Sequence, residues 1–382
     1  MTTSAPSIGA SAAAPLNVEE AVRDRYSAAS KEAEAALCCP VDYDAAYLKV
    51  LPEEILERDY GCGDPSKWVA EGETVLDLGS GGGKICYIAS QVVGPGGRVI
   101  GVDCNDDMLS LARTHQSDVA AKIGHDNVTF FKGRIQDLAL DLDRFGGVLG
   151  QQPVVDAAGW LGALEEADRL RKAAPMVADE SVDVVVSNCV LNLVAESDRR
   201  QLFSELARVL KVGGRAVISD IVSDRDVPQE LKDDADLWSG CISGAYREDA
   251  FLAAFEEAGF YGIEVVSRQA EPWQVVEGIA FRSVTVRAYK PDPRATDAEA
   301  GHHAVYNGPW AFVMDEAGNQ FPRGEAVLVT TAQFERLTRP PYADRVTLLQ
   351  EADAPEPTDP TPSAKRPSLD IVGGCCGDSG CC

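Results

Sequence analysis

The chain has 382 residues, of which 45% are hydrophobic and 25% are charged, and its formal net charge at pH 7 is -26. This length suffices for one large domain with additional segments, or for two domains. The excess of acidic residues argues against a nucleic-acid partner, because binding to the phosphate backbone needs clustered Lys and Arg. No apolar run in the sequence reaches the roughly 18 residues of a membrane-spanning helix. We therefore expect no nucleic-acid partner and no membrane partner.

The sequence contains eleven cysteines and only four histidines. Its first residues lack the basic start and apolar stretch of a secretory signal, and the first Arg, expected early in an organellar transit peptide, is Arg23. We therefore expect a cytoplasmic protein, in which thiols are free, metal-binding or catalytic. No histidine stands at zinc-finger spacing from a cysteine pair, so a conventional structural zinc site is not predicted.

Apolar strands and helices alternate along most of the chain, which predicts an α/β fold with a doubly wound parallel sheet. A helix over residues 18–36 is expected to precede it, and the last two strands are expected to be antiparallel because no crossover helix separates them. The strands are expected at residues 74–78, 98–102, 128–132, 182–187, 215–221, 262–268 and 281–289. The helices between them are expected at residues 84–93, 106–116, 198–210 and 248–258.

Changes in composition divide the chain into four predicted parts. Residues 1–70 form an N-terminal segment that includes a cysteine lid, and residues 71–290 form the main domain with a helical insertion at about 141–180. Residues 291–350 form a small β-containing region, and residues 351–382 have the composition of a disordered tail. The tail ends in two vicinal cysteine pairs, which could capture a soft ion or relay electrons, or could be dispensable. These are Cys375, Cys376, Cys381 and Cys382.

A glycine-rich loop follows the first predicted strand, in the pattern Asp77-x-Gly79-x-Gly81-x-Gly83. Counting from Gly79, the sixth position is Lys84, so the loop does not fit the dinucleotide fingerprint Gly-x-Gly-x-x-Gly. It resembles the loop of class I S-adenosylmethionine methyltransferases, in which small residues let the backbone approach the amino-acid end of the methyl donor. That resemblance implies a donor site formed by Asp77, Gly79, Ser80, Gly81, Gly83, Asp103, Cys104, Met108, Ile135, Gln136 and Asn188. In this site the Asp103 carboxylate would accept the ribose hydroxyls.

Three cysteines are expected near this site. Cys189 follows the fourth predicted strand, at the sheet edge where α/β folds bind ligands. Cys241 follows the fifth strand after a short helix, and Cys62 stands between two glycines before the first strand. We expect all three to meet, whereas we interpret Cys86 as a small core residue.

The segments that contain these cysteines resemble those of arsenite S-adenosylmethionine methyltransferases. The resemblance covers roughly residues 18–290. It is closest to the microbial branch of the family, including members associated with arsenosugar formation. The resemblance implies a Rossmann-like seven-stranded class I methyltransferase fold and a role in arsenic detoxification or biotransformation. The segments are Tyr60-Gly61-Cys62-Gly63, Asp77-Leu78-Gly79-Ser80-Gly81, Ser187-Asn188-Cys189-Val190-Leu191-Asn192-Leu193 and Gly240-Cys241-Ile242-Ser243-Gly244-Ala245. Gly240 departs from the Glu of animal-type members.

The same resemblance implies a mechanism. Cys62, Cys189 and Cys241 would bind As(III) of arsenite or methylarsenite as thiolates, which are soft ligands suited to a soft centre. Methylation oxidises arsenic, so a disulfide between Cys62 and Cys38 or Cys39 would return electrons, with thioredoxin or glutathione restoring the thiols. Tyr60 and Gly61 would belong to the lid over the substrate.

Two other functions stay open at this point. The donor loop alone would equally suit a methyltransferase of another small acceptor, such as an amine, a quinone or an organic thiol, although that reading leaves the three cysteines unexplained. A protein that binds metalloids without catalysis would account for the cysteine-rich tail, but it would leave the donor loop unused.

Overall fold

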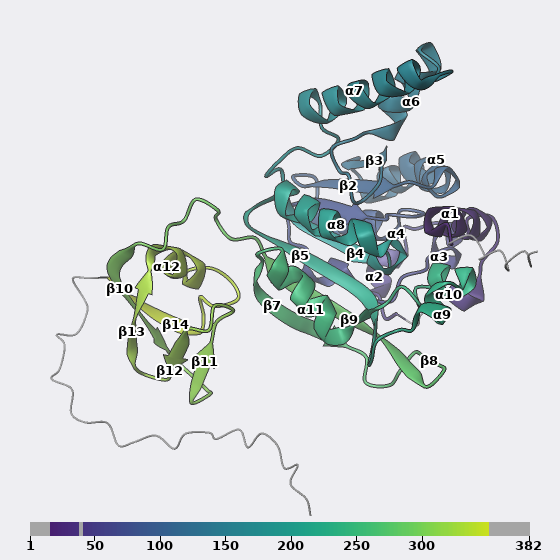
Figure 1. The fold of residues 1–382 in the computed structure, drawn as a ribbon. Helices are drawn as coiled ribbons and strands as arrows, with labels where there is room; N and C mark the ends of the chain where they lie inside the picture. The colour runs from purple at the N-terminus through teal and green to yellow at the C-terminus, as the bar shows by residue number, and fades with distance from the viewer. Residues whose placement is uncertain (1–15, 38–40, 351–382) are drawn as a thin grey trace, which may run out of the picture. The chain divides into compact units, whose positions relative to one another are not determined.

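The computed structural model describes residues 16–37 and 41–350, so Cys38, Cys39 and the tail lie outside the described residues (Figure 1). Contacts divide the chain into two compact units, Met1–Arg294 and Ala295–Cys382. Within the described ranges, no helix is long and apolar enough to cross a membrane.

The first unit is built on a mixed sheet whose main path has seven strands in the order β3-β2-β1-β4-β5-β9-β7. The five strands from β3 to β5 are parallel, and β9 pairs antiparallel with both β5 and β7. The predicted seven-stranded fold with a closing antiparallel pair is thus confirmed. Two short strands, β6 and β8, also pair with β5 and β9, and they bring the sheet to nine strands. The bounds are β1 Thr74–Leu78, β2 Arg98–Asp103, β3 Val128–Lys132, β4 Val182–Asn188, β5 Leu210–Ser223, β6 Tyr246–Arg247, β7 Tyr261–Arg268, β8 Gln274–Val276 and β9 Ile279–Tyr289.

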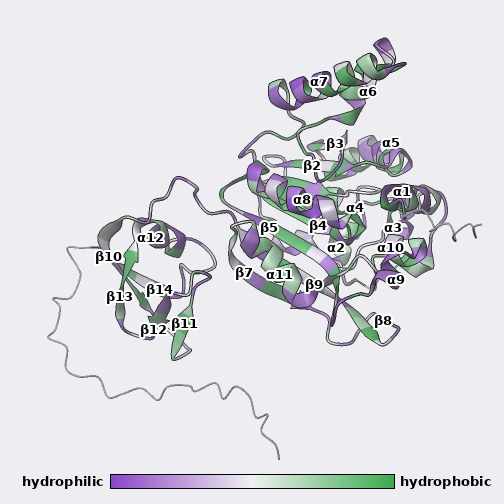
Figure 2. Cartoon of the chain, in the orientation of Figure 1, coloured by the Kyte–Doolittle hydropathy of each residue, from purple (hydrophilic) through white to green (hydrophobic). Residues whose placement is uncertain are grey.

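Helices cover both faces of the sheet, because successive strand residues point to opposite sides. Along β1, Val75 packs in the hydrophobic cluster of α4 (Lys84–Val93) and α5 (Asp106–Ile123). Leu76 belongs to the opposite cluster, with α8 (Glu196–Val209) and α11 (Glu248–Glu257). Figure 2 shows hydrophobic residues concentrated in these central strands.

The predicted helical insertion forms α6 (Leu142–Gln151) and α7 (Ala157–Ala173) beside the edge strand β3 (Figure 1). Its own small core contains Leu140, Ala167 and Leu170. An ion pair of 2.9 Å between Arg171 and Asp137 joins α7 to the loop after β3.

The predicted N-terminal helix is shorter than expected. It forms α1 (Val18–Ala29), and residues 35–37 form a separate 3-10 turn, η1 (Ala35–Leu37). The expectation of a helix to residue 36 was wrong because Ser30 ends α1, its hydroxyl donating to the Ser27 carbonyl, and the chain then turns toward Tyr60. The remaining elements before β1 are α2 (Ala45–Leu48), α3 (Glu53–Glu57) and η2 (Pro65–Trp68).

A second difference concerns the fifth strand, which begins at Leu210 rather than at Arg215. The predicted turn at Gly213 is a bulge within β5, because Leu210 pairs with Val182 but the next pair is Arg215 with Val184. Gly213 has φ 76°, a left-handed conformation that glycine adopts without strain.

The second unit contains the β region that the sequence predicts. It also contains one helix, which lies between its last two strands in the chain. A three-stranded sheet has the order β13-β10-β14, and β11 and β12 form a separate two-stranded sheet. The helix α12 begins with a capping box between Thr330 and Gln333. The bounds are β10 Glu299–Tyr306, β11 Phe312–Met314, β12 Gln320–Pro322, β13 Ala326–Thr330, α12 Thr331–Leu337 and β14 Val346–Leu349.

The packing of α11 provides a test of the fold. Phe255 is fully buried, and its ring lies edge-on to Phe203 and Phe251 with centroid distances of 5.0 and 5.5 Å. We expect Phe255→Ala to lower the free energy of unfolding by about 3–5 kcal/mol, because it leaves a cavity in the core. Urea unfolding measures this change. The control Val265→Ala, at a position that is 41% exposed, should change it by no more than about 0.5 kcal/mol. Equal losses would contradict the packing.

Candidate functional site

A pocket opens where β1, β2 and β4 end, above the glycine-rich loop. Gly79 and Gly81 have φ values of 67° and 50°, and a Cβ atom on Gly79 would lie 2.4 Å from the Val190 side chain. Glycine is therefore required at position 79, where the loop passes the side chain of Val190, just after β4. The lining includes these residues expected to bind a donor: Asp77, Gly79, Ser80, Gly81, Asp103, Cys104, Met108, Ile135, Gln136 and Asn188.

Gly83 differs from the other predicted donor residues, because it does not line the pocket. It precedes α4 with φ 86°, and a Cβ atom there would come within 2.8 Å of the Phe130 ring. Its role is to let α4 pack closely against the sheet.

Two carboxyl groups, one buried (Asp77) and one half-buried (Asp103), make the pocket suitable for a positively charged ligand. Burial raises the pKa of Asp77 to about 8, and it also raises the pKa of Asp103 above its ordinary value. The Asp103 carboxylate accepts hydrogen bonds from the backbone N–H groups of Gly81 and Asn105, both at 2.8 Å. The Asp77 carboxyl group accepts a hydrogen bond from the side-chain thiol of Cys86 at 3.3 Å. Among the described residues, neither carboxyl group has a Lys, Arg or His partner within 4.0 Å. A cationic ligand would stabilise their ionised forms.

The pocket also has a free hydrogen-bonding group. The Ser80 hydroxyl is buried without a partner among the described residues, so it could bind a polar ligand group. Gln136 also lines the pocket and is buried, and its amide oxygen can be oriented to accept from Arg134 at 2.7 Å.

The helix α1 forms one wall of the pocket, which the sequence did not indicate. Glu19, Val22, Arg23 and Tyr26 line the cavity from α1. Arg134 links this helix to α8, because it forms ion pairs with Glu19 in α1 and with Asp198 in α8. The content of Glu, Ala and Arg that predicts a helix here includes no chemical motif, so it gave no sign that the helix contributes to a site.

The loop with Cys62 is fixed onto the end of β4 by one amide side chain. The Asn188 oxygen accepts from the backbone N–H groups of Cys62 at 2.9 Å and Gly63 at 3.0 Å, and its nitrogen donates to the Gly63 carbonyl at 2.8 Å. A Cβ atom on Gly61 would lie 2.0 Å from the Asn188 nitrogen. The loop is therefore held in place and buried, rather than open to solvent.

Tyr60, predicted to belong to the lid, lines the pocket together with Gly61. Its ring lies edge-on to Tyr26 with a centroid distance of 6.0 Å, and its hydroxyl donates to the Ala29 carbonyl at 2.8 Å. The lid residues are thus joined to α1.

The structure brings the three predicted cysteines into one buried cluster, which lies beside the pocket. Cys62, Cys189 and Cys241 belong to the same hydrophobic cluster, and Cys189 also lines the pocket. Cys189 and Cys241 have φ values of 65° and 60°, which non-glycine residues rarely adopt and which are common at functional sites. The Cys241 thiol donates to the Cys189 carbonyl at 3.1 Å.

Two thiols of this cluster, those of Cys62 and Cys189, are harder to ionise than an ordinary thiol. Burial raises the pKa of Cys62, to which nearby Asp220 also contributes, although a hydrogen bond from Cys189 lowers it. Burial raises the pKa of Cys189 well above its ordinary value. Burial likewise raises the pKa of Tyr26, whose hydroxyl interacts with Cys241.

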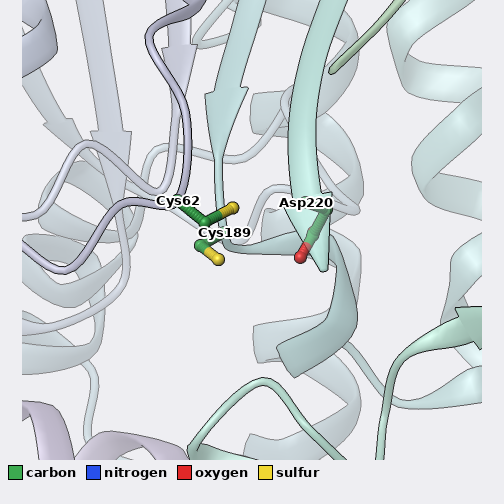
Figure 3. Close-up of side chains that lie close together, drawn as sticks. All are labelled: Cys62, Cys189 and Asp220. Atoms are coloured by element: carbon green, nitrogen blue, oxygen red, sulfur yellow. The ribbon is translucent and has the colours of Figure 1, made fainter. Parts of the chain in front are cut away.

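One further residue of the cluster was missed in the sequence. The carboxylate of Asp220, in β5, and the sulfur atoms of Cys62 and Cys189 all lie within 4.8 Å of one another, and Cys241 is not part of this closest group (Figure 3). Burial raises the pKa of Asp220 to about 6. A lone acidic residue between apolar strand residues Ile218 and Ile221 was the signal that could have identified it.

Comparisons with known proteins show which families the two units of the chain resemble. A family described as a methyltransferase domain matches residues 70–173 and 164–259, and a domain of unknown function (DUF8838) matches residues 294–370. An arsenite methyltransferase of Halobacterium salinarum is 35% identical over 271 residues, which are 69% of this chain and 58% of that protein. The chain thus spans less than two thirds of that relative.

Two further relatives are covered more fully. An arsenite methyltransferase of Aquipseudomonas alcaligenes is 31% identical over 331 residues, which are 80% of this chain and 85% of that protein. The crystal structure of an arsenic (III) S-adenosylmethionine methyltransferase from Chlamydomonas reinhardtii has a TM-score of 0.55 and 27% identity, and the match covers 82% of this chain and 97% of that one.

The contact between Gly61 and Asn188 yields a prediction. Gly61→Ala should displace the loop, because its Cβ atom would overlap the Asn188 amide. We expect Cys62 to react with iodoacetamide at least about tenfold faster in this variant, since local opening exposes it. Mass spectrometry of the alkylated peptide measures the rate. The matched control is Gly146→Ala in α6, where a Cβ atom meets no atom within 4 Å. An unchanged rate in Gly61→Ala would contradict the assigned role of Asn188.

Asp77 yields a prediction about pH. Its pKa of about 8 in the folded chain exceeds the ordinary value of 3.8, so the folded state binds more protons between these values. The Asp77 contribution to stability is therefore present at low pH and is lost as the pH rises toward 8. We expect Asp77→Asn to lose less unfolding free energy than the wild type between pH 5 and pH 8. Urea unfolding of ligand-free protein at both pH values tests this, and parallel losses would refute it.

Proposed function

Since the chain belongs to the arsenite methyltransferase family, and is therefore an S-adenosylmethionine-dependent enzyme that methylates arsenic, we propose that its three buried cysteines bind the trivalent substrate. The substrates would be arsenite and methylarsenite. The observation that supports this most directly is that Cys189 belongs both to the thiol cluster and to the donor pocket. A metalloid bound by the cluster would thus lie next to the donor.

The donor site offers groups for each part of a cationic methyl donor. When bound, S-adenosylmethionine supplies an electrophilic methyl group on a positively charged sulfur. The carboxyl groups of Asp77 and Asp103 would balance positive charge in the pocket, and Asp103 has capacity left to accept hydroxyl groups. Ser80 would donate or accept a further hydrogen bond.

The substrate site would work by ligand exchange. Arsenite has three hydroxyl groups, and each neutral thiol that replaces one forms an As–S bond and releases a water molecule. Such exchange needs no net proton uptake, which suits a buried cluster in which burial raises the pKa of the Cys62 and Cys189 thiols. Cys241 would have to turn from the Cys189 carbonyl toward the arsenic atom. Three thiolates from different segments would hold arsenic at a fixed place, so that catalysis depends on proximity and orientation.

The reaction would also need a source of electrons. Methylation takes an electron pair from arsenic, so two electrons must return to form the trivalent product. Oxidation of Cys62 with Cys38 or Cys39 to a disulfide would supply them, and thioredoxin or glutathione would reduce that disulfide. A reducing compartment such as the cytoplasm would keep these thiols available.

Serine variants test the assignment of the cysteines. We expect Cys62→Ser to abolish methylation of arsenite but to spare methylarsenite, because each methyl group takes the place of one thiolate. Cys189→Ser and Cys241→Ser should abolish methylation of both. Product speciation after incubation with S-adenosylmethionine, a thiol reductant and each substrate measures this.

Binding of S-adenosylmethionine provides the control, since all three variants should retain it if they fold. Loss of both activities in Cys62→Ser would contradict the stepwise scheme. A wild type that binds the donor but produces no methylated arsenic would instead favour another small acceptor.

A further inference from the structure

The closest group of ligand atoms in the thiol cluster differs from the three cysteines expected to hold arsenic. It consists of the sulfur atoms of Cys62 and Cys189 and a carboxylate oxygen of Asp220, all within 4.8 Å of one another and all buried (Figure 3). The Cys241 thiol instead donates to a backbone carbonyl. The described conformation therefore offers two sulfur ligands and one oxygen ligand.

We propose that Cys62, Cys189 and Asp220 form a binding site for a divalent zinc-type cation, with a fourth position left for water. Zinc accepts mixed sulfur and carboxylate ligands in tetrahedral geometry, whereas As(III) is best served by three thiolates. Tetrahedral Zn–S bonds of about 2.3 Å place two sulfur atoms about 3.8 Å apart. This separation lies within the 4.8 Å limit found here, so small side-chain movements would close the site.

The ligands are held in position by their surroundings. The Asp220 oxygens accept from the Asn192 amide at 2.8 Å and from the backbone N–H of Ile221 at 2.8 Å. The Cys62 backbone is fixed by Asn188 and by Ser283, whose hydroxyl donates to the Cys62 carbonyl at 2.6 Å. Such supporting hydrogen bonds orient ligands in established metal sites.

Zinc binding would exchange one Zn²⁺ ion for two protons. One Zn²⁺ ion would replace the protons of the two thiols and pair with the Asp220 carboxylate, releasing two protons and leaving a net charge of -1 on the group. The cation and the arsenic substrate would then compete for Cys62 and Cys189. This competition rests on the proposed function, whereas zinc binding itself does not.

The experiment uses full-length protein in which the vicinal cysteines, at positions 38, 39, 375, 376, 381 and 382, and the exposed Cys104 are replaced by serine. Zn²⁺ binding is measured by competition with a chromophoric chelator, in the absence of arsenite and donor. We expect one ion per chain and the release of two protons. Asp220→Asn should weaken this binding by at least about 10-fold, because losing even a group that only supports a ligand costs about 10- to 100-fold in metal affinity. Cys241→Ser, the matched control in the same cluster, should bind Zn²⁺ within about twofold of its parent.

X-ray absorption of the zinc-loaded parent keeps the test independent of any variant. Two sulfur ligands with oxygen completing the shell support the proposal, and three sulfur ligands overturn it. An absence of stoichiometric Zn²⁺ binding also overturns it. Retention of donor binding shows that Asp220→Asn has folded, and equal Zn²⁺ affinity in that folded variant overturns the role of Asp220.

Arsenite binding separates this proposal from the proposed function. Quenching of tryptophan fluorescence by arsenite should be lost in Cys241→Ser and should be competed by Zn²⁺ in the parent protein. Zinc binding without any arsenite binding would support the metal site and contradict the proposed substrate.

Discussion

The side chain of Asn188 is the interaction on which the site depends. It stands at the end of β4 and binds the backbone of the loop that brings Cys62 from more than a hundred residues earlier in the chain. Its nitrogen also donates to the Tyr43 hydroxyl at 3.1 Å, which ties the N-terminal segment to the same point. One neutral amide can make all these contacts because it has both donors and acceptors. Asp or Leu, of similar size, could not.

Burial is the second constraint, and it affects charge. The donor pocket and the thiol cluster place Asp77, Asp220 and several cysteines where water is excluded, and burial favours their neutral forms. The unliganded protein is thereby less stable than it would be with apolar residues at these positions. A cationic ligand or a thiol-binding metalloid relieves part of that cost, so ligand binding and folding are thermodynamically linked.

The sequence predicted the fold well because periodicity and glycine-rich turns are local signals. The strand of residues 74–78, the loop after it and the helix of residues 84–93 have the predicted bounds. The end of α1 and the bulge at Gly213 were missed, since both depend on contacts with segments that are distant in the sequence. The predicted meeting of the three cysteines agrees with the structure.

The contacts of Asp220 and α1 could not be predicted in the same way, because the lone acidic residue in an apolar strand marks Asp220 without indicating its partners, and α1 has no motif. Asp220 is recognised as part of the cluster only when two strands and a loop are brought together, and α1 reaches the pocket through tertiary packing alone. The direction of the Cys241 thiol also depends on its left-handed backbone and on Cys189, which no residue pattern specifies.

The position of Tyr26 has a consequence for the order of events during turnover. This residue lines the pocket, interacts with Cys241 and packs against Tyr60, so that α1 borders both the pocket and the thiol cluster. Arg25 from the same helix donates to the Asp236 carbonyl at 2.6 Å in α10 (Ala235–Ser239), just before Cys241. A displacement of α1 wide enough to release a spent donor would therefore expose the thiols in the same motion. Release of the spent donor and exposure of the thiol cluster would then depend on the same movement of α1.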